Sequence, residues 1–488
     1  MDNLNNIQCQ LCIFESIIKS KTMALKHLDL EINEQEPFEN CKLDRKKYAD
    51  VLTNIIENYS EGFVLAINNK WGTGKTTFVK MWQQSLKNSN YETIYFNAWE
   101  NDLENNPLTA LIGELKTISS NDDKTFKKII SSAAKLSKNV APALVKAILN
   151  KYIDSEVLVE ALSDSVKTGT EIFEDEIKEY TERKKSIINF RNDLSNFVSK
   201  NAEGKPLIFI IDELDRCRPN YSVSLLEQVK HFFNVKNIVF VLSIDKEQLG
   251  NAICGVYGSD KIDSTEYLRR FIDIEYSIPE PNNGEFFNYL FEYFDYNTFF
   301  NSRERLQHYE FQYDKETFIS ASKIILQKCN LRQIEKIMAT TRITLRTLSH
   351  SNYLIPIIYI FLVYIKFIHS SYYRNLILKN LKINEVQNKF LEIIKPFINS
   401  ENERYFIQIE ALLLIFYNNY IFENRGKNEI FEYERSSNTY KLKIKSSIND
   451  EALLEYYSSR DRSFNSYLDL NLDYLIKKIE LTESLKIN

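Results

Sequence analysis

The sequence predicts an α/β fold in which a parallel sheet is covered by helices. Four short apolar runs, rich in β-branched and aromatic residues, predict buried strands over 63–67, 93–96, 207–211 and 238–244. Helical patterns follow the first and third of these runs, over 77–87 and 222–233. Because strands that alternate with helices usually form a parallel sheet with both faces covered, these elements predict that architecture.

The composition indicates an ordinary globular protein. The chain has 488 residues, enough for roughly three domains at about 150 residues each. With 44% hydrophobic and 26% charged residues it is too apolar to be disordered as a whole. Six cysteines are too few for a disulfide scaffold, and the first 16 residues lack the features of a secretion signal. These observations favour a cytoplasmic protein.

The charge balance excludes a protein whose whole surface binds nucleic acid. Lys and Arg number 62 against 67 Asp and Glu, which gives a formal net charge of −5. Proteins that cover nucleic acid with a large surface are strongly basic. The charge balance does not exclude a local basic patch, or a nucleic acid that binds to it.

Changes of pattern divide the chain. A helical spacing over 43–56 predicts a helix ahead of the first strand, and strand-like alternation recurs late, over 439–444. We expect an N-terminal segment with little pattern (1–40), a sheet core (41–107 and 204–282), a helical insertion (108–203), a helical domain that completes the core (283–370) and a mainly helical C-terminal domain (371–488).

Two apolar segments raise the question of a membrane span. Residues 353–365 are apolar for 13 residues, whereas a bilayer requires about 20, so a buried core helix is predicted. Residues 129–149 are long enough, but each of their three lysines costs about 3 kcal/mol near the bilayer centre. This segment predicts two amphipathic helices broken near Pro142, and peripheral association with a membrane stays open.

A candidate phosphate-binding loop follows the first predicted strand. The chain runs from that strand into NNKWGTGKTT (68–77) and then into a helix, the context that such a loop requires. Gly72 and Gly74 let backbone N–H groups approach an anion. Lys75 is expected to reach the β- and γ-phosphates, and Thr76 to ligate Mg²⁺. The alternative is a coincidental glycine-rich turn.

The loop departs from the pattern GxxxxGK[ST] at its first position, where Asn69 replaces glycine. Asparagine is the residue other than glycine that best tolerates a positive φ. We therefore expect Asn69 to preserve the turn.

Two carboxylates follow the strand predicted over 207–211. In open parallel sheets, ligands bind at the carboxyl ends of the strands. Asp212 is therefore a candidate Mg²⁺ ligand, and Glu213 a candidate base that orients or deprotonates the water attacking a γ-phosphate. Strand-ending acids are often only solvated loop residues. Together with GKT on an earlier strand, however, this pair predicts a site for a nucleoside triphosphate.

Two further pairs of residues are candidates for the site, each with an alternative role. Ser243 and Asp245, at the end of the strand predicted over 238–244, would lie beside the phosphate loop if the two strands are neighbours; Asp245 is equally a plain helix cap. Arg269 and Arg270 are candidates for stabilising charge in a transition state, in cis or across a subunit contact, or for an exposed basic face.

Other chemistries have little support. Cys9, Cys12 and Cys41, with His27, give at most an incomplete zinc site. The sequence contains neither HExxH nor GxSxG, and we find no nuclease or protease signature. An effector reaction would then require a partner protein.

The motifs and their order resemble the KAP P-loop NTPases. The matching pieces are LDRKKYADVL (43–52), WGTGKTT (71–77), YFNAWE (95–100), IIDELDRCRP (210–219), IVFVLSID (238–245), YLRRFI (267–272) and LRQIEKIM (331–338). The resemblance covers about residues 40–370 and implies a core related to the AAA+ and STAND NTPases, with ATP, Mg²⁺ and slow hydrolysis. Members often insert helices, frequently membrane-spanning, between the nucleotide motifs, and bacterial members are often linked to defence against phages.

The chain departs from the family pattern at two positions. The family usually has glycine where Asn69 stands, and commonly a second aspartate where Glu213 stands. With glutamate at this position, the chain is more similar to an AAA+ hydrolytic site. The residues expected to contact nucleotide are Asn69, Trp71, Gly72, Thr73, Gly74, Lys75, Thr76, Thr77 and Asp245. Those expected to act in catalysis are Lys75, Asp212, Glu213, Arg269 and Arg270.

The sequence supports three hypotheses of function. The first is an ATPase whose nucleotide state rearranges its helical parts and so controls a partner protein or its own assembly into a homo-oligomer. The second is a scaffold that holds nucleotide without useful turnover. The third is an NTPase associated with a membrane surface through residues 129–149.

Overall fold

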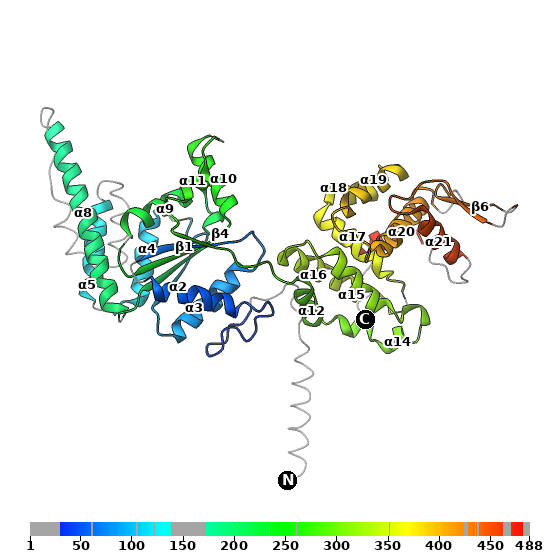
Figure 1. Cartoon of the computed structure of the whole chain (residues 1–488), viewed down its shortest axis with the longest axis horizontal. Coiled ribbons are helices and arrows are strands. Elements are labelled where there is room, and N and C mark those ends of the chain that lie inside the picture. Colours follow the sequence, from blue (N-terminus) through cyan, green and yellow to red (C-terminus); the bar gives the residue numbers. More distant parts are fainter. Residues whose placement is uncertain are drawn as a thin grey trace, which may run out of the picture. The chain divides into compact units, whose positions relative to one another are not determined.

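A computed structural model of the chain describes residues 30–481 except for 60–61, 104–105, 121–122, 138–171, 203, 234, 260, 351, 424–427, 435, 437–438 and 462–469. The described residues divide into two compact units, with the boundary between Glu280 and Pro281. We call residues 29–280 the sheet unit and residues 281–488 the helical unit, and describe each by itself (Figure 1).

The sheet unit contains five parallel strands in the order β2-β3-β4-β1-β5. The strands are β1 (Phe63–Asn68), β2 (Thr93–Asn97), β3 (Leu207–Asp212), β4 (Ile238–Ile244) and β5 (Ile274–Tyr276). All four predicted strands are present, and the predicted α/β class is confirmed. The sequence analysis missed β5 because it has three residues, none of them buried, and so lacks an apolar run.

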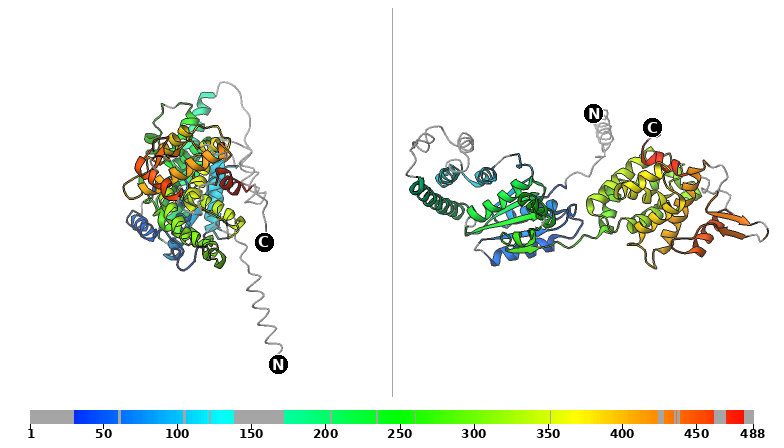
Figure 2. Two further views of the ribbon diagram at one scale, coloured as in Figure 1. Left: turned by 90° about the vertical axis from the view of Figure 1, so that its right-hand side faces the viewer. Right: turned by 90° about the horizontal axis from the view of Figure 1, so that it is seen from above.

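Helices cover both faces of the sheet (Figure 2). One face packs against α2 (Lys46–Asn58) and α3 (Lys75–Asn88). The other face packs against α4 (Pro107–Leu115), α5 (Lys124–Ser137), α8 (Ile172–Asn201), α9 (Pro219–Phe232) and α10 (Lys246–Tyr257). The unit also contains α11 (Ser264–Leu268) and the short 3₁₀ turns η1 (Lys116–Ile118) and η2 (Leu214–Arg216).

The helical insertion joins the sheet unit through the paired helices α5 and α8. Asp123, just before α5, accepts hydrogen bonds from Lys200 and Asn201 at the end of α8, at 2.8 and 3.3 Å. Further along, the Ser132 hydroxyl donates to Asp193 at 2.9 Å. The apolar face of residues 129–134 is buried against the core, and the rest of the segment 129–149, from residue 138 onward, lies outside the described residues.

The helical unit is built around one continuous apolar core. Its helices are α12 (Asn283–Tyr293), α13 (Tyr296–Phe300), α14 (Arg303–Leu306), α15 (Asp314–Ile325), α16 (Leu331–Thr347), α17 (Pro356–Ile368), α18 (Ser370–Ile377), α19 (Ile383–Ile394), α20 (Glu403–Ile421), α21 (Asp450–Asp461) and α22 (Leu472–Ile479), together with the 3₁₀ turn η3 (Tyr309–Phe311). A two-stranded antiparallel hairpin, β6 (Phe431–Glu434) and β7 (Thr439–Leu442), completes it. The helices of 283–370 and those of 371–488 share this core, because α17 packs against both α15 and α20.

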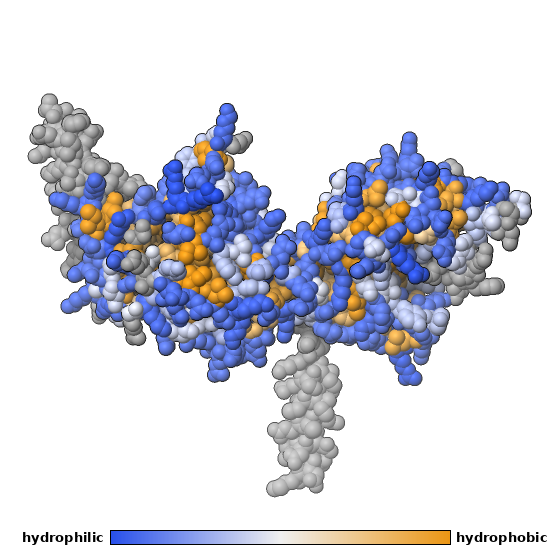
Figure 3. All heavy atoms as spheres, viewed as in Figure 1, coloured by the Kyte–Doolittle hydropathy of each residue, from blue (hydrophilic) through white to orange (hydrophobic). Residues whose placement is uncertain are grey.

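Among the described helices α17 is the most apolar, and the prediction that it is a buried core helix is confirmed. Its residues are buried from Pro356 to Ile365 among the other helices of the unit. No helix in the described part of the chain is both long enough and apolar enough to cross a membrane. The face shown in Figure 3 is largely hydrophilic, with apolar residues in scattered patches.

A buried arginine fixes one end of the helical unit. The Arg305 guanidinium is fully buried between the rings of Phe299 and Phe311, with its centre 4.7 and 4.3 Å from the ring centroids. It pairs with Asp314 and donates to the backbone carbonyl of Asn352 at 3.0 Å. Burial raises the pKa of Asp314 to about 6 in spite of this partner.

This shift predicts that lowering the pH stabilises the helical unit against unfolding. Because the pKa of Asp314 is about 6 in the folded protein and 3.8 ordinarily, the folded state binds this proton more tightly, and stability falls as pH rises through that window. When the pH is lowered from 7 to 5, the free energy of unfolding of wild type should rise by about 1 kcal/mol relative to that of Asp314→Asn. Urea unfolding followed by circular dichroism measures this, with the exposed neighbour Glu316→Gln as control. An identical pH response of wild type and Asp314→Asn would contradict it.

Candidate nucleotide site

The loop between β1 and α3 has the backbone shape of a phosphate-binding loop. Gly72 and Gly74 have φ values of 79° and 81°, in the left-handed region that favours glycine. Gly74 immediately precedes the first turn of α3, so the N–H groups that begin this helix have no partner within the helix. An anion at this point would receive those N–H groups and the favourable helix dipole.

The Lys75 side chain folds over this loop. Its ammonium group donates to the backbone carbonyls of Asn69 and Lys70, the latter at 3.3 Å. Burial lowers the pKa of Lys75, and the negative charges of Asp215, Asp245 and Asp212 partly offset that effect. Lys75 is therefore a buried cation that three carboxylates influence electrostatically.

A buried arginine that the sequence analysis did not single out supports the same loop. Arg45, just before α2, donates to the carbonyls of Thr73 at 2.7 Å and Gly74 at 3.1 Å. Its exposed fraction is 4%, and burial lowers its pKa. The piece LDRKKYADVL contains this arginine and was the only available signal for it.

Loss of Arg45 should destabilise the sheet unit. Arg45→Ala removes a buried guanidinium and its hydrogen bonds to the half-buried carbonyls of Thr73 and Gly74, which costs about 1–3 kcal/mol. All 3 tryptophans of the chain lie in the sheet unit, so urea unfolding followed by tryptophan fluorescence reports on this unit alone. The exposed neighbour Lys46→Ala is the matched control; equal stability of both variants would contradict the assignment.

Asn69 acts differently from the expectation. It does not have a positive φ, so that part of the expectation is wrong, although the loop keeps the backbone shape of a phosphate-binding loop. Instead its side-chain amide donates to the carbonyl of Ile278 at 2.7 Å and accepts from the Ile278 N–H at 2.9 Å. The Asn69 side chain therefore joins the start of the loop to the segment that follows β5.

The carboxylates predicted at the end of β3 lie on the same edge of the sheet as the loop. Asp212 is 1% exposed and accepts from the Tyr95 hydroxyl at 2.9 Å and from the Glu213 N–H at 3.0 Å. Burial and the Asp212 charge raise the pKa of Tyr95. Tyr95 therefore stays protonated and fixes the orientation of the Asp212 carboxylate.

Glu213 has a strained backbone. Its φ is 61°, which is rare for a residue other than glycine and often marks a functional position. Its carboxylate pairs with Arg216 at 2.8 Å, and the guanidinium of Arg216 lies 5.8 Å from the ring centroid of the exposed Trp99. Trp99 belongs to the predicted YFNAWE piece, which the structure thus brings to the β3 end.

Asp215, also missed by the sequence analysis, connects the three loops of the site. Its carboxylate accepts from the Trp71 indole N–H at 2.5 Å and from the Asp245 backbone N–H at 2.8 Å. Asp245 in turn accepts from the Trp71 backbone N–H at 3.2 Å and caps α10 through Gln248. Asp245 is thus both a helix cap and a contact of the phosphate loop.

Ser243 is a buried hydroxyl in the middle of this edge. In the sheet register it lies between Asp212 on β3 and Ile67 on β1, on the face that α3 covers. Its side chain is fully buried, and among the described residues its hydroxyl has no hydrogen-bond partner. A buried polar group normally finds a partner, so this hydroxyl is suited to a ligand.

Several predicted residues are not brought together with the loop. Arg269 and Arg270 lie exposed after α11, and Arg269 pairs with Glu266 at 2.8 Å. Cys9, Cys12 and His27 lie outside the described residues; within the described part, no group of three or more His, Cys, Asp or Glu side chains could hold a metal ion.

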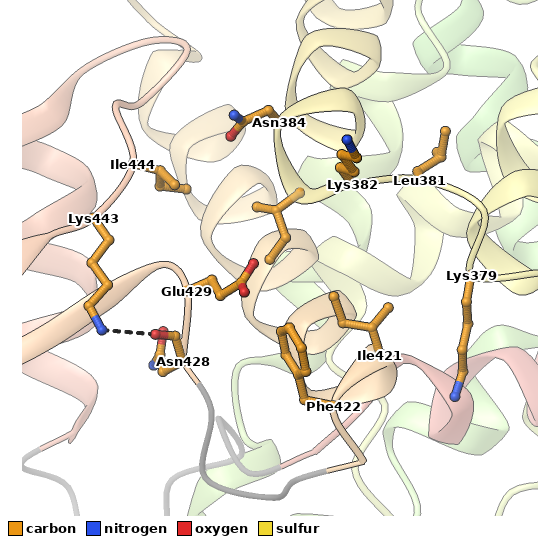
Figure 4. A pocket seen from close by; sticks show the side chains of 11 residues that line it. Lys379, Leu381, Lys382, Asn384, Ile421, Phe422, Asn428, Glu429, Lys443 and Ile444 are labelled. Atoms are coloured by element: carbon orange, nitrogen blue, oxygen red, sulfur yellow. Dashed lines mark hydrogen bonds between the residues drawn. The ribbon is translucent and has the colours of Figure 1, made fainter.

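The helical unit has a separate open groove of about 940 Å³ (Figure 4). It is lined by Lys379, Leu381, Lys382, Ile383, Asn384, Ile421, Phe422, Asn428, Glu429, Lys443 and Ile444. None of the nucleotide motifs contributes to it.

Comparison with known proteins identifies the family of this chain. A family model described as KAP family P-loop domain matches residues 45–348, more than half of the chain. No curated protein matches the chain. Among solved structures, the ORC2 protein of Aeropyrum pernix, solved in ADPNP and ADP complexes, is similar at 12% identity, with a TM-score of 0.29, over 86% of this chain and 95% of that chain. On the family match, which begins at the loop-binding Arg45 and spans every motif of the site, this chain belongs to the KAP family of P-loop NTPases.

Proposed function

We propose that the protein binds Mg-ATP at the carboxyl edge of its sheet and hydrolyses it, and that the nucleotide state controls a protein partner or its own assembly. The observation that carries this proposal is the arrangement around Lys75. A buried cation on a glycine loop in left-handed geometry faces Asp212, Asp215 and Asp245 from the ends of β3 and β4. Such an arrangement suits a polyphosphate with its metal.

The described residues fit a bound Mg²⁺ and phosphate chain. The Thr76 hydroxyl and the Asp212 carboxylate are the oxygen donors that Mg²⁺ prefers, and the partnerless Ser243 hydroxyl faces the same edge. Mg²⁺ neutralises charge on the β- and γ-phosphate oxygens. Lys75, Gly72 and the first turn of α3 would hold the phosphates.

Glu213 is the proposed base for the attacking water. It follows Asp212 directly, and its backbone is left-handed, with a φ of 61°. A carboxylate within reach of a water molecule can orient it and accept its proton. Arg269 and Arg270 stay candidates for charge stabilisation, in cis or from another copy of the chain.

A scaffold that binds nucleotide without turnover is the second candidate. The observation that favours it is the Glu213–Arg216 ion pair, because a carboxylate that already binds arginine must exchange this partner before it can orient the attacking water. The antiphage role and the peripheral membrane association stay predictions from the sequence. Plaque counts on a bacterial host, with wild type and Lys75→Ala, test the former; vesicle flotation tests the latter.

Phosphate release by the purified chain tests the proposal. With saturating Mg-ATP we expect turnover that falls to background when EDTA removes Mg²⁺, because the metal carries part of the charge stabilisation. The same measurement with Mg-GTP shows whether the site prefers adenine or guanine nucleotides. Tight ATP binding without phosphate release would favour the scaffold, and absence of binding by the folded protein would overturn both candidates.

A further inference from the structure

The side chain of Asn69 joins the phosphate loop to the segment that follows β5. Its amide makes a two-way pair with the backbone of Ile278, one bond as donor and one as acceptor, as a neighbouring strand would. Ile278 is 2% exposed, so water does not compete easily for these bonds. Glycine, the residue of the general pattern at this position, could make neither bond.

The preceding residue makes a similar connection. The Asn68 amide donates to Glu275 at 2.8 Å and accepts from the Lys246 backbone N–H at 3.0 Å. Lys246 and Glu275 also pair directly, at 2.6 Å. We call the Asn68 and Asn69 side chains with these partners the asparagine clasp; it holds together the exits of β1, β4 and β5.

Asn69 also contacts the phosphate-binding lysine. Its backbone carbonyl accepts a hydrogen bond from the Lys75 ammonium, while its side chain holds Ile278. Ile278 lies two residues before Glu280, where the sheet unit ends and the chain passes to the helical unit. One residue therefore contacts both the lysine expected to bind phosphate and the chain exit.

We infer that Asn69 couples the occupancy of the nucleotide site to the segment 278–280 that leads to the helical unit. This inference rests on the proposed nucleotide binding. Phosphate oxygens compete with the Asn69 carbonyl for the Lys75 ammonium, so binding changes the hydrogen bonds of the peptide that carries the Asn69 amide. If bound nucleotide changes the equilibrium constant for forming the Asn69–Ile278 pair by some factor, linkage requires that the pair change the affinity for nucleotide by the same factor.

A double-mutant cycle in the full chain tests the coupling, with Mg-ADPNP as the probe. Ile278→Pro removes the backbone N–H that donates to the Asn69 side-chain oxygen. Because Pro279 follows, the backbone of residue 278 already favours the extended conformation. Ile278→Val keeps that N–H and is the matched control. We expect Ile278→Pro to raise the Kd for Mg-ADPNP about 3- to 10-fold, and Ile278→Val to change it less than 2-fold.

The Asn69→Gly background separates coupling from simple damage. If Ile278→Pro acts through the clasp, it should have no further effect on Kd once Asn69 is glycine. Equal effects of Ile278→Pro in both backgrounds would overturn the inference, because the substitution would then act through something other than Asn69. If the folded wild type does not bind Mg-ADPNP, the proposed function fails first, and this binding measurement identifies that case.

Hydrogen exchange gives a second measurement that does not depend on the proline variant. In the absence of nucleotide, the Ile278 N–H should exchange at least about 10-fold faster in Asn69→Gly than in wild type, because its acceptor is gone. In wild type, saturating Mg-ADPNP should change this exchange rate at least about 3-fold. An Ile278 exchange rate that is the same with and without bound Mg-ADPNP would overturn the coupling.

Discussion

Replacement of Glu213 by glutamine is expected to lower phosphate release from Mg-ATP by about 10²- to 10⁴-fold, the usual contribution of a general base. Glutamine keeps the size of the side chain but cannot accept the proton of the attacking water. Since the Lys75 loop is untouched, the variant should still bind ATP and hold it. Rapid-quench and filter-binding measurements on the same preparation separate the loss of turnover from the loss of binding.

The matched control for this prediction is Glu247→Gln, an exposed glutamate in the first turn of α10. It should release phosphate at the wild-type rate. Full turnover in Glu213→Gln would exclude Glu213 as the base. Its left-handed backbone and its pair with Arg216 would then have a structural role only.

Replacement of Lys75 by alanine should weaken ATP binding at least about 100-fold. Charge-assisted hydrogen bonds from an ammonium to phosphate oxygens are strong, and 100-fold corresponds to about 2.7 kcal/mol. The fold should survive, because the cost of burying the Lys75 charge, which lowers its pKa, offsets the loss of its hydrogen bonds to the Asn69 and Lys70 carbonyls. We therefore expect unchanged or higher stability together with lost binding, measured by urea unfolding and nucleotide titration with tryptophan fluorescence.

Lys87→Ala is the control, because Lys87 lies exposed in the last turn of the same helix, α3. It should bind ATP as wild type does. If Lys75→Ala bound ATP with wild-type affinity, the loop would not be a phosphate site. If it lost binding together with stability, the loss would be one of folding and the role of Lys75 would have to be tested by Lys75→Arg.

The sequence predicted those parts of the site that depend on backbone pattern. The glycines, Lys75 and the carboxylates after β3 could be placed because a buried strand followed by a helix start fixes where such residues lie. Asp245 could be placed conditionally, and the pairing of β4 with β1 fulfils the condition. The family match covers the same motifs.

What the sequence could not predict depends on side chains that meet across long separations. Arg45 reaches carbonyl groups 28 and 29 residues away, and Asp215 binds an indole 144 residues away. The Asn69 amide pairs with a backbone 209 residues away. No periodicity records such contacts, since each depends on which strands become neighbours. The single core of the helical unit escaped prediction for the same reason.

The bond between Asp123 and the end of α8 has a consequence for the variability of this protein. Helices α5 and α8 both belong to the sheet unit, and a salt bridge of 2.8 Å joins Asp123, just before α5, to Lys200 at the end of α8. Whatever length of chain lies between them, the ends are already closed, so lengthening it costs little entropy. A foreign domain, such as a fluorescent reporter, can therefore be inserted between α5 and α8 at little cost, as long as both helices and their buried apolar faces are kept.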